Sequence, residues 1–569
     1  MSGGRGTPDV DAWVVLALVC ALAACAGAWL WAGTAGVLFG RGWPAEGLWQ
    51  AALALTRLPF RLSDPARAWP AAARASLPGP VPFYAALPLL AGAGATIALL
   101  LRRIASATGL ARLGARGGAG ARWASGRELR PLLCGGEREG RLVLGRRGAR
   151  LVRAEHRHAL VAFGPPQSGK SAGLAVPALL EWEGPAVASS IKTDLLAATI
   201  SRRRALGNVY VFDPFSLSGV PAQRWSPLHG ALTWDGALEA AWRLAAAAQL
   251  DSRGMEGGDF WAVAAEQRLA PLLFVAARTG GGIEALVRWA YGQGARELDQ
   301  ALAQVTGEAR DARELADAHA AYDAVRAFEA QADRTRSSIE ATAQALLRAY
   351  RFSRVATSAS AAEITAQRLL DESATLYLIG DAKASKLLRP IFLALLSEIV
   401  DVSYERATRR GGRLERPLLL CLDEAGNVAP LPNLAEIAST APSHNIQLVS
   451  IFHDLAQARS RYGSQAETVV NSHRARMLLP GVADLDTLRY FSGLVGEEET
   501  REITRTTGAG GSTRSSGRRR RPLLAPEALR QLSEGEALLV YGRIPPVRLR
   551  LRLWFADRTL RRLQAGEAS

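Results

Sequence analysis

The chain has 569 residues, which is long enough for two or three domains. Its formal net charge of +16 and its pI near 10.4 suit a partner made of phosphate or an anionic membrane surface, and composition alone does not choose between the two. The four cysteines have no metal-ligand spacing and the seven histidines form no ligand cluster, so the sequence predicts neither a zinc site nor disulfides.

Two uncharged runs near the N-terminus are each long enough to cross a bilayer. Residues Ala12 to Gly40 form a run of 29 residues without a charge, and Ala75 to Leu101 form one of 27. A bilayer core needs about 20 helical residues. We therefore predict a membrane anchor in residues 1–101, with two transmembrane helices at about 12–39 and 81–101.

The distribution of arginine predicts the orientation of this anchor. Residues 102–153 carry 13 arginines and three glutamates, whereas the loop 41–74 carries five arginines and two acids. By the positive-inside rule, both termini lie in the cytoplasm. We expect a multi-pass protein of the inner (cytoplasmic) membrane, in which residues 102–130 are a basic connector to a cytoplasmic body.

Residues 161–180 read VAFGPPQSGKSAGLAVPALL, which is an apolar run, a glycine-rich turn and a second apolar run. The turn fits the pattern G-x-x-x-x-G-K-S/T, whose backbone N–H groups hold the phosphates of a nucleotide. An incidental lysine is a poor alternative, because the chain has only four lysines. We predict ATP and Mg²⁺ as cofactors, with Lys170 on the β and γ phosphates and the Ser171 hydroxyl as a ligand of Mg²⁺. The predicted nucleotide-binding residues are Gly164, Pro165, Pro166, Gln167, Ser168, Gly169, Lys170 and Ser171.

Beyond this loop, short apolar runs alternate with helical patterns, which is typical of an α/β domain with a parallel sheet. This pattern stops at residues 234–350, which are rich in Ala, Arg, Glu and Gln with helical spacing. We predict that residues 131–233 and 351–569 form the nucleotide-binding domain and that 234–350 form an inserted all-α domain. The predicted strands are His158–Phe163, Ala186–Ile191, Val209–Phe212, Thr375–Ile379, Leu418–Asp423, Ile446–Phe452, Arg476–Leu479 and Ala537–Tyr541.

The run Leu418 to Glu424 is an apolar strand that ends in two acids. Asp423 can complete the Mg²⁺ shell, and Glu424 can orient and polarise the attacking water, which are roles that phosphoryl transfer requires. Such a strand alone is a weak signal, but together with the phosphate loop it predicts a catalytic site.

Lys192 and Asp194 follow another predicted strand. A role near the nucleotide and a helix start that Thr193 or Asp194 caps explain these residues equally well.

Residues Thr506 to Arg521 read TTGAGGSTRSSGRRRR. We expect a loop here. The composition leaves two alternatives open, a disordered solvated loop and a loop that contacts the phosphates of nucleic acid.

These motifs resemble the membrane-anchored coupling ATPases of type IV secretion, the TraG/TraD-like conjugative DNA-transfer proteins, and look most like actinobacterial members. The resemblance covers nearly the whole chain. Besides the spans and the phosphate loop, it rests on SSIKTDLL, VYVFDPF, WSPL, GGDFW, LLLCLDEAGNVAPLPNL, DLAQARSRYG, NSHRARMLLPG and RPLLAPEALRQLSEGEALLVYGRIPP.

The resemblance implies a RecA-like P-loop NTPase domain that carries the all-α insertion and assembles as a homo-hexamer. Such proteins receive single-stranded DNA with its relaxase, or a protein effector, and deliver it to the channel components of a type IV secretion system. Two other functions stay open, a membrane cargo receptor with weak ATPase activity and a chromosome-segregation type DNA pump. The pump would normally have more membrane spans and a separate DNA-reading domain.

The sequence departs from its relatives after the strand that follows the acidic one. Relatives commonly carry glutamine where this chain has His453. We expect this residue to face the γ-phosphate, either as a nucleotide sensor that can also take a proton near neutral pH or simply as a neutral donor. No arginine lies between Ala425 and Phe452, so the nearest downstream candidates for an arginine finger are Arg459 and Arg461.

Overall fold

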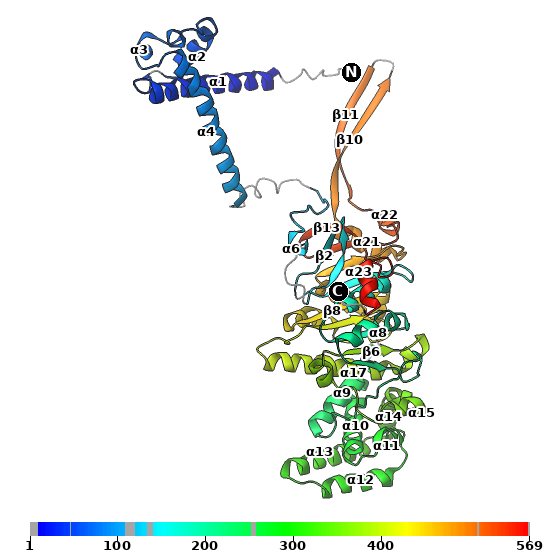
Figure 1. The fold of residues 1–569 in the computed structure, drawn as a ribbon. Helices are drawn as coiled ribbons and strands as arrows, with labels where there is room; N and C mark the ends of the chain where they lie inside the picture. The colour runs from blue at the N-terminus through cyan, green and yellow to red at the C-terminus, as the bar shows by residue number, and fades with distance from the viewer. Residues whose placement is uncertain are drawn as a thin grey trace. The chain divides into compact units, whose positions relative to one another are not determined.

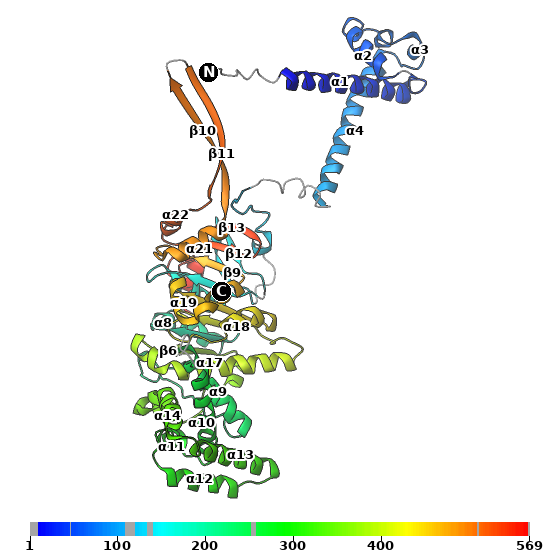
Figure 2. The ribbon, with the colours of Figure 1, turned by 180° about the vertical axis from the view of Figure 1, so that it is seen from behind.

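The computed structural model describes residues 10–45, 47–107, 120–133, 140–156, 158–251, 258–508 and 511–566. The chain divides into two compact units, Met1–Ala119 and Gly120–Ser569 (Figures 1 and 2).

The N-terminal unit is helical. Indole and phenyl rings hold its two long helices together, since Trp31 Nε1 donates a hydrogen bond of 2.8 Å to the Phe83 carbonyl and the Phe83 ring is fully buried. Its elements are α1 (Val10–Phe39), α2 (Leu48–Arg57), η1 (Leu58–Phe60), η2 (Pro65–Ala68), α3 (Ala71–Arg74) and α4 (Pro80–Ala107).

Among the described residues, three helical stretches are long and apolar enough to cross a membrane. Ala21–Phe39 in α1 and Pro80–Ile97 in α4 match the two predicted spans, and only 22% and 11% of these windows are buried. The third, Phe260–Arg278, is 67% buried, because it lies in the helical part of the larger unit and packs against neighbouring helices. Its apolar character is therefore that of a core helix.

The larger unit contains an 11-stranded sheet in the order β2-β1-β13-β12-β9-β3-β8-β7-β4-β6-β5. The strands from β9 to β5 pair in parallel, as the sequence predicts. The strands from β2 to β12 are antiparallel, so the sheet is mixed. The strands are β1 (Val143–Arg147), β2 (Arg150–Arg153), β3 (Leu160–Phe163), β4 (Ala186–Ser190), β5 (Val209–Phe212), β6 (Thr375–Ile379), β7 (Leu418–Leu422), β8 (Ile446–Phe452), β9 (Ala475–Leu478), β12 (Glu536–Tyr541) and β13 (Ile544–Arg550).

Each parallel strand is buried on both sides. In β3, Val161 and Phe163 belong to one hydrophobic cluster, and Leu160 and Ala162 belong to another on the opposite face. Because apolar side chains cover both faces of the sheet, polar side chains can gather at the carboxyl ends of the strands.

Helices cover both faces of the sheet and form a separate bundle between β5 and β6. Figure 1 shows α9 to α14 gathered beyond α17, at the opposite end of this unit from β13. The helices are α6 (Arg130–Leu133), η3 (Ser171–Ala175), α7 (Val176–Glu181), α8 (Asp194–Leu206), α9 (Trp234–Asp251), α10 (Gly258–Arg278), α11 (Gly282–Ala290), α12 (Ala295–Gly307), α13 (Ala312–Glu329), α14 (Asp333–Leu347), η4 (Arg348–Arg351), α15 (Ser353–Thr357), α16 (Ala366–Asp371), α17 (Ala382–Arg409), α18 (Leu434–Thr440), η5 (Ala441–His444), α19 (Leu455–Tyr462), η6 (Gly463–Gln465), α20 (Ala466–Ser472), α21 (Leu485–Val495), α22 (Pro526–Arg530) and α23 (Arg558–Gln564).

The prediction of a loop at residues 506–521 is wrong. Residues 506–508 and 511–521 belong to a separate two-stranded antiparallel hairpin, β10 (Glu497–Gly508) and β11 (Gly511–Pro522), in which Gly508 pairs with Gly511. Its threonines favour extended backbone, so a composition typical of a linker here forms strands.

Candidate functional site

The predicted phosphate loop connects β3 to η3, a single turn of π-helix. Gln167 and Gly169 have φ of +66° and +85°, so the loop turns through left-handed backbone conformations. A Cβ at Gly164 would lie 2.4 Å from Ser168 Oγ and 3.1 Å from the Leu479 side chain, so a larger residue there would displace its neighbours. The loop therefore has the backbone shape that surrounds an anion.

Three of the predicted site side chains meet at the end of this loop. The Lys170 side chain is buried, and its Nζ lies 3.2 Å from Glu424 Oε1 and 3.1 Å from His453 Nδ1. Because an ammonium group only donates hydrogen bonds, His453 Nδ1 accepts here and the ring proton belongs on Nε2. His453 Nε2 lies 3.8 Å from Glu424 Oε1, so the imidazole faces the same carboxylate.

Ser171 and Asp423 form the second predicted pair. Ser171 Oγ donates a hydrogen bond of 2.5 Å to Asp423 Oδ2, while the buried Asp423 Oδ1 has no partner. Burial raises the pKa of Asp423, and the Ser171 hydrogen bond and the Lys170 charge oppose this rise. A hydroxyl and a carboxylate with an unpartnered oxygen are ligands that Mg²⁺ prefers, so these two residues fit the predicted metal site.

Glu424 is held as a carboxylate. Burial would raise its pKa, but the charge of Lys170 and hydrogen bonds from Asn427 and Lys170 lower the pKa overall. Its backbone has φ of +61°, which is unusual for a residue with a side chain. Asn427 reinforces this turn, because its N–H donates to the Glu424 carbonyl at 2.8 Å and its side-chain amide donates to the carboxylate at 3.2 Å.

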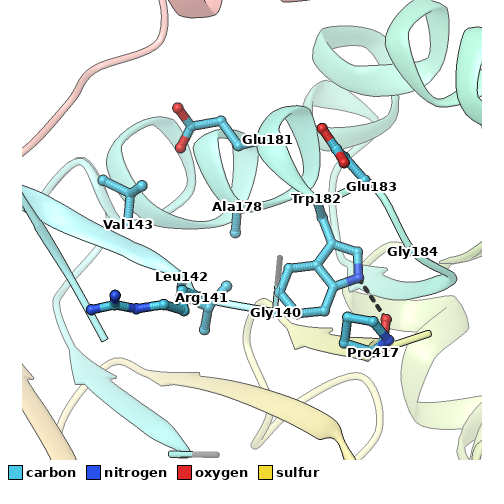
Figure 3. Close-up of a pocket in the computed structure, with 10 residues that line it drawn as sticks. All are labelled: Gly140, Arg141, Leu142, Val143, Ala178, Glu181, Trp182, Glu183, Gly184 and Pro417. Carbon is cyan, nitrogen blue, oxygen red and sulfur yellow. Dashed lines mark hydrogen bonds between the residues drawn. The ribbon is translucent and has the colours of Figure 1, made fainter. Parts of the chain in front are cut away.

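Most of the predicted site residues line one cavity of about 580 Å³, whereas Gly164 and Pro165 do not. Pro166 to Ala172 form one wall, and Asp423, Glu424 and His453 lie beside them. A separate hollow beside Trp182 and Pro417 has a volume of only about 30 Å³ (Figure 3). That volume suits about one water molecule, whereas the larger cavity has room for a nucleotide.

The cavity also has lining residues outside the predicted site, including the two whose role the sequence left open. Lys192 and Asp194 line it, and α8 begins at Asp194, whereas the Thr193 side chain makes no capping hydrogen bond. Glu534, Gly535, Leu553 and Phe555 line it from the C-terminal region. No motif marks these last four residues, because the pairing of β12 and β13 onto β9 is what positions the C-terminal region here.

The two candidate finger arginines are both engaged within the chain. Arg459 forms ion pairs with Glu467 at 2.9 Å and with Asp486 at 2.6 Å. Arg461 Nε donates a hydrogen bond of 2.7 Å to the Gly426 carbonyl. Arg461 is therefore tied to the turn that carries Glu424.

A phosphate loop between β3 and a helix, with an acidic strand end from β7 in the same parallel sheet, defines a RecA-like P-loop NTPase. The chain belongs to the family described as type IV secretory system conjugative DNA transfer, whose model matches residues 126–568. The sequence-based recognition of a coupling protein is thus confirmed, whereas the likeness to actinobacterial members stays a prediction.

Curated relatives agree with this assignment. The chain is 26% identical over 398 residues to the conjugal transfer protein TraG of Escherichia coli, with 65% of this chain and 60% of the relative covered. It is 24% identical over 433 residues to the protein VirD4 of Rhizobium rhizogenes, covering 73% and 61%. The chain therefore spans about 60% of the length of these relatives.

Solved structures share the fold. The unbound bacterial conjugative coupling protein TrwBdeltaN70 superposes with a TM-score of 0.57 at 17% identity, covering 76% of this chain and 93% of that one. The plasmid coupling protein TrwB in complex with ADP and Mg²⁺ gives a TM-score of 0.56 at 17% identity, covering 76% and 94%.

Proposed function

We propose that this protein is a membrane-anchored ATPase that recruits single-stranded DNA with its relaxase to a type IV secretion channel and drives transfer by ATP hydrolysis. One observation carries the proposal. In a chain of the conjugative DNA transfer family, Lys170, Ser171, Asp423 and Glu424 converge on a single cavity with room for a nucleotide. The structure of TrwB with ADP and Mg²⁺ supports the choice of cofactors.

The site supports hydrolysis through its own side chains. The backbone N–H groups of the phosphate loop would hold the phosphates, and Lys170, which pairs with Glu424 in this structure, would contact the β and γ phosphates. Ser171 and Asp423 would hold Mg²⁺, which neutralises charge on the phosphate oxygens. Glu424, released from Lys170, is then free to orient the attacking water.

The hairpin β10–β11 supports the proposal that the cargo carries phosphate groups. In its ladder Arg501 pairs with Arg518 and Arg505 pairs with Arg514, so basic residues stand opposite each other at two levels. The side chains of Arg518 and Arg520 are 75% and 72% exposed. We propose that this hairpin contacts the DNA backbone, where arginine contributes affinity without reading sequence.

The anchor and the assembly are further parts of the proposal. We propose that α1 and α4 both cross the inner membrane, with both chain ends in the cytoplasm, supported by their apolar and mostly exposed windows. We propose that residues 131–233 and 351–569 act as the motor, with 234–350 as an inserted domain. The homo-hexamer and the contact with channel components rest on the family assignment.

Steady-state hydrolysis by the full chain in detergent tests this function. We expect Mg²⁺-dependent hydrolysis of ATP that single-stranded DNA stimulates. Lys170→Ala should lose nucleotide affinity, whereas Glu424→Gln should bind ATP and stall. Binding of ATP and DNA without stimulated hydrolysis would favour a cargo receptor, and wild-type turnover in both variants would show that the site is elsewhere.

A further inference from the structure

The segment Leu551 to Phe555, which follows β13, crosses the start of the phosphate-loop helix. The Trp554 N–H donates a hydrogen bond of 3.1 Å to the Ala172 carbonyl. Leu551 packs so closely on this helix that a Cβ at Gly173 would lie 3.1 Å from its side chain. The C-terminal region is therefore bound directly to the residues that follow Ser171.

An ion-pair cluster fixes this segment. Arg552 is 4% exposed and pairs with Glu181 at the end of α7, at 2.7 Å, and with Asp557 at 3.0 Å. Asp557 also pairs with Arg146 of β1 at 2.9 Å. Because these charges are partly desolvated and mutually paired, the segment has a defined position beside the cavity.

Phe555 presents an apolar surface to this cavity. The residue is 54% exposed and lines the cavity together with Leu553. Its ring makes an edge-to-face contact with the ring of Trp554, at 6.0 Å between centroids and 82° between planes. The exposed part of the Phe555 ring is available for stacking.

The phosphate loop defines which end of a nucleotide would reach Phe555. Lys170 takes the β and γ phosphates at the end of the cavity that holds Glu424 and His453. The N-terminus of the following helix would hold the α-phosphate of a bound nucleotide. The sugar and base would continue from that phosphate, and the segment that is hydrogen-bonded to Ala172 at the start of this helix ends in Phe555.

We propose that Phe555, supported by Leu553, is the platform on which the nucleobase stacks. This inference rests on the proposed function, because it requires a nucleotide in the cavity. Every base offers an aromatic face, so stacking on a phenyl ring contributes affinity for adenine and guanine alike. The platform therefore sets how tightly a nucleoside triphosphate binds and leaves the phosphate contacts unchanged.

Calorimetric titration of the full chain in detergent tests the platform with three probes, ATPγS, GTPγS and inorganic tripolyphosphate. We expect Phe555→Ala to weaken binding of both nucleotides by roughly 5- to 100-fold, as loss of one base stack does, and to leave tripolyphosphate binding unchanged. Phe555→Tyr should restore nucleotide affinity. Phe352→Ala is the matched control, since Phe352 is 51% exposed and does not line the cavity.

The outcomes of this titration distinguish a failure of the base-stacking platform from a failure of the nucleotide site. Unchanged nucleotide affinity in Phe555→Ala would overturn the inference while leaving the ATPase proposal intact. An equal loss for tripolyphosphate would also overturn it, because Phe555 would then act through the phosphate loop. A wild-type chain that bound none of the three probes would overturn the proposed function and the platform with it.

Discussion

Lys170 Nζ lies 3.2 Å from Glu424 Oε1, so the lysine of the phosphate loop is paired with the carboxylate of the acidic strand end. Both side chains are largely buried, with exposed fractions of 8% and 18%. The Lys170 ammonium has three N–H donors, and Glu424 and His453 engage two of them, so contact with both the β and γ phosphates requires at least one of these partners to give way. Nucleotide binding should therefore release Glu424 for its role with water.

This pairing predicts opposite effects of Glu424→Gln on binding and on turnover. The amide carries no charge to retain Lys170, so affinity for ATPγS should stay equal or rise, while hydrolysis should fall by about 10²- to 10⁴-fold. Binding by fluorescence titration and hydrolysis by phosphate release measure the two quantities on the same preparation. A variant that binds ATPγS more weakly than the wild type would contradict the competition.

The contact between Lys170 and His453 predicts which substitutions are tolerated. A glutamine carbonyl can accept the hydrogen bond that His453 Nδ1 accepts, whereas alanine cannot. We expect His453→Gln to retain DNA-stimulated hydrolysis and His453→Ala to lower it by about tenfold or more, as loss of a hydrogen bond to a charged group does. Equal rates in the wild type and both variants would mean that His453 is no sensor.

The hairpin predicts a change in the salt dependence of DNA binding. Arg518→Ala with Arg520→Ala should reduce the slope of log affinity against log salt by about 1.4, or about 0.7 for each lost phosphate contact on a single strand. Arg409→Ala with Arg410→Ala is the control, since those arginines are 79% and 61% exposed and also lie beside glutamates. An equal reduction in both double variants would show that general charge, and not the hairpin, determines the slope.

The burial of His473 predicts that the folded protein loses stability in mild acid. Its ring is fully buried between the Val469 carbonyl and Ser450 Oγ, and burial lowers its pKa to about 4. The unfolded chain takes up a proton below pH about 6.5 while the folded chain stays neutral, so this contribution to stability is complete above that pH and is lost toward pH 4. The loss should reach about 3 kcal/mol.

Urea unfolding followed by tryptophan fluorescence between pH 7 and 4 measures this loss. His473→Gln should flatten the pH dependence, and His319→Gln, at an exposed position, should leave the wild-type dependence in place. If His473→Gln kept the full dependence on pH, another group would be responsible.

Strands and site residues could be predicted from the sequence where the environment of a side chain depends on its immediate neighbours. Strands such as β5, β6 and β8 lie at the predicted residues, because short apolar runs in a parallel sheet are buried on both faces. The phosphate loop and the acidic end of β7 could be located for a related reason, since phosphate and Mg²⁺ demand particular residues at fixed spacing.

Features that depend on long-range pairing were not predictable in this way. β1, β2 and β13 carry arginines, and they form strands by pairing in series at one end of the sheet, β2 with β1, β1 with β13 and β13 with β12. Phe555 lies 384 positions after Ser171 in the chain numbering, and nothing in its local sequence indicates a cavity. The hairpin was missed because threonine, serine and glycine are typical of loops as well as of two-stranded ribbons.

The left-handed backbone of Glu424 has a consequence for protein engineering. A residue with a Cβ at φ of +61° is strained by about 1 kcal/mol or more, and glycine would relieve that strain. The same substitution would delete the carboxylate beside the buried Lys170, so the relief of backbone strain is opposed by the loss of an ion pair. A thermostabilised version of this protein that still hydrolyses ATP has to keep a strained residue at position 424.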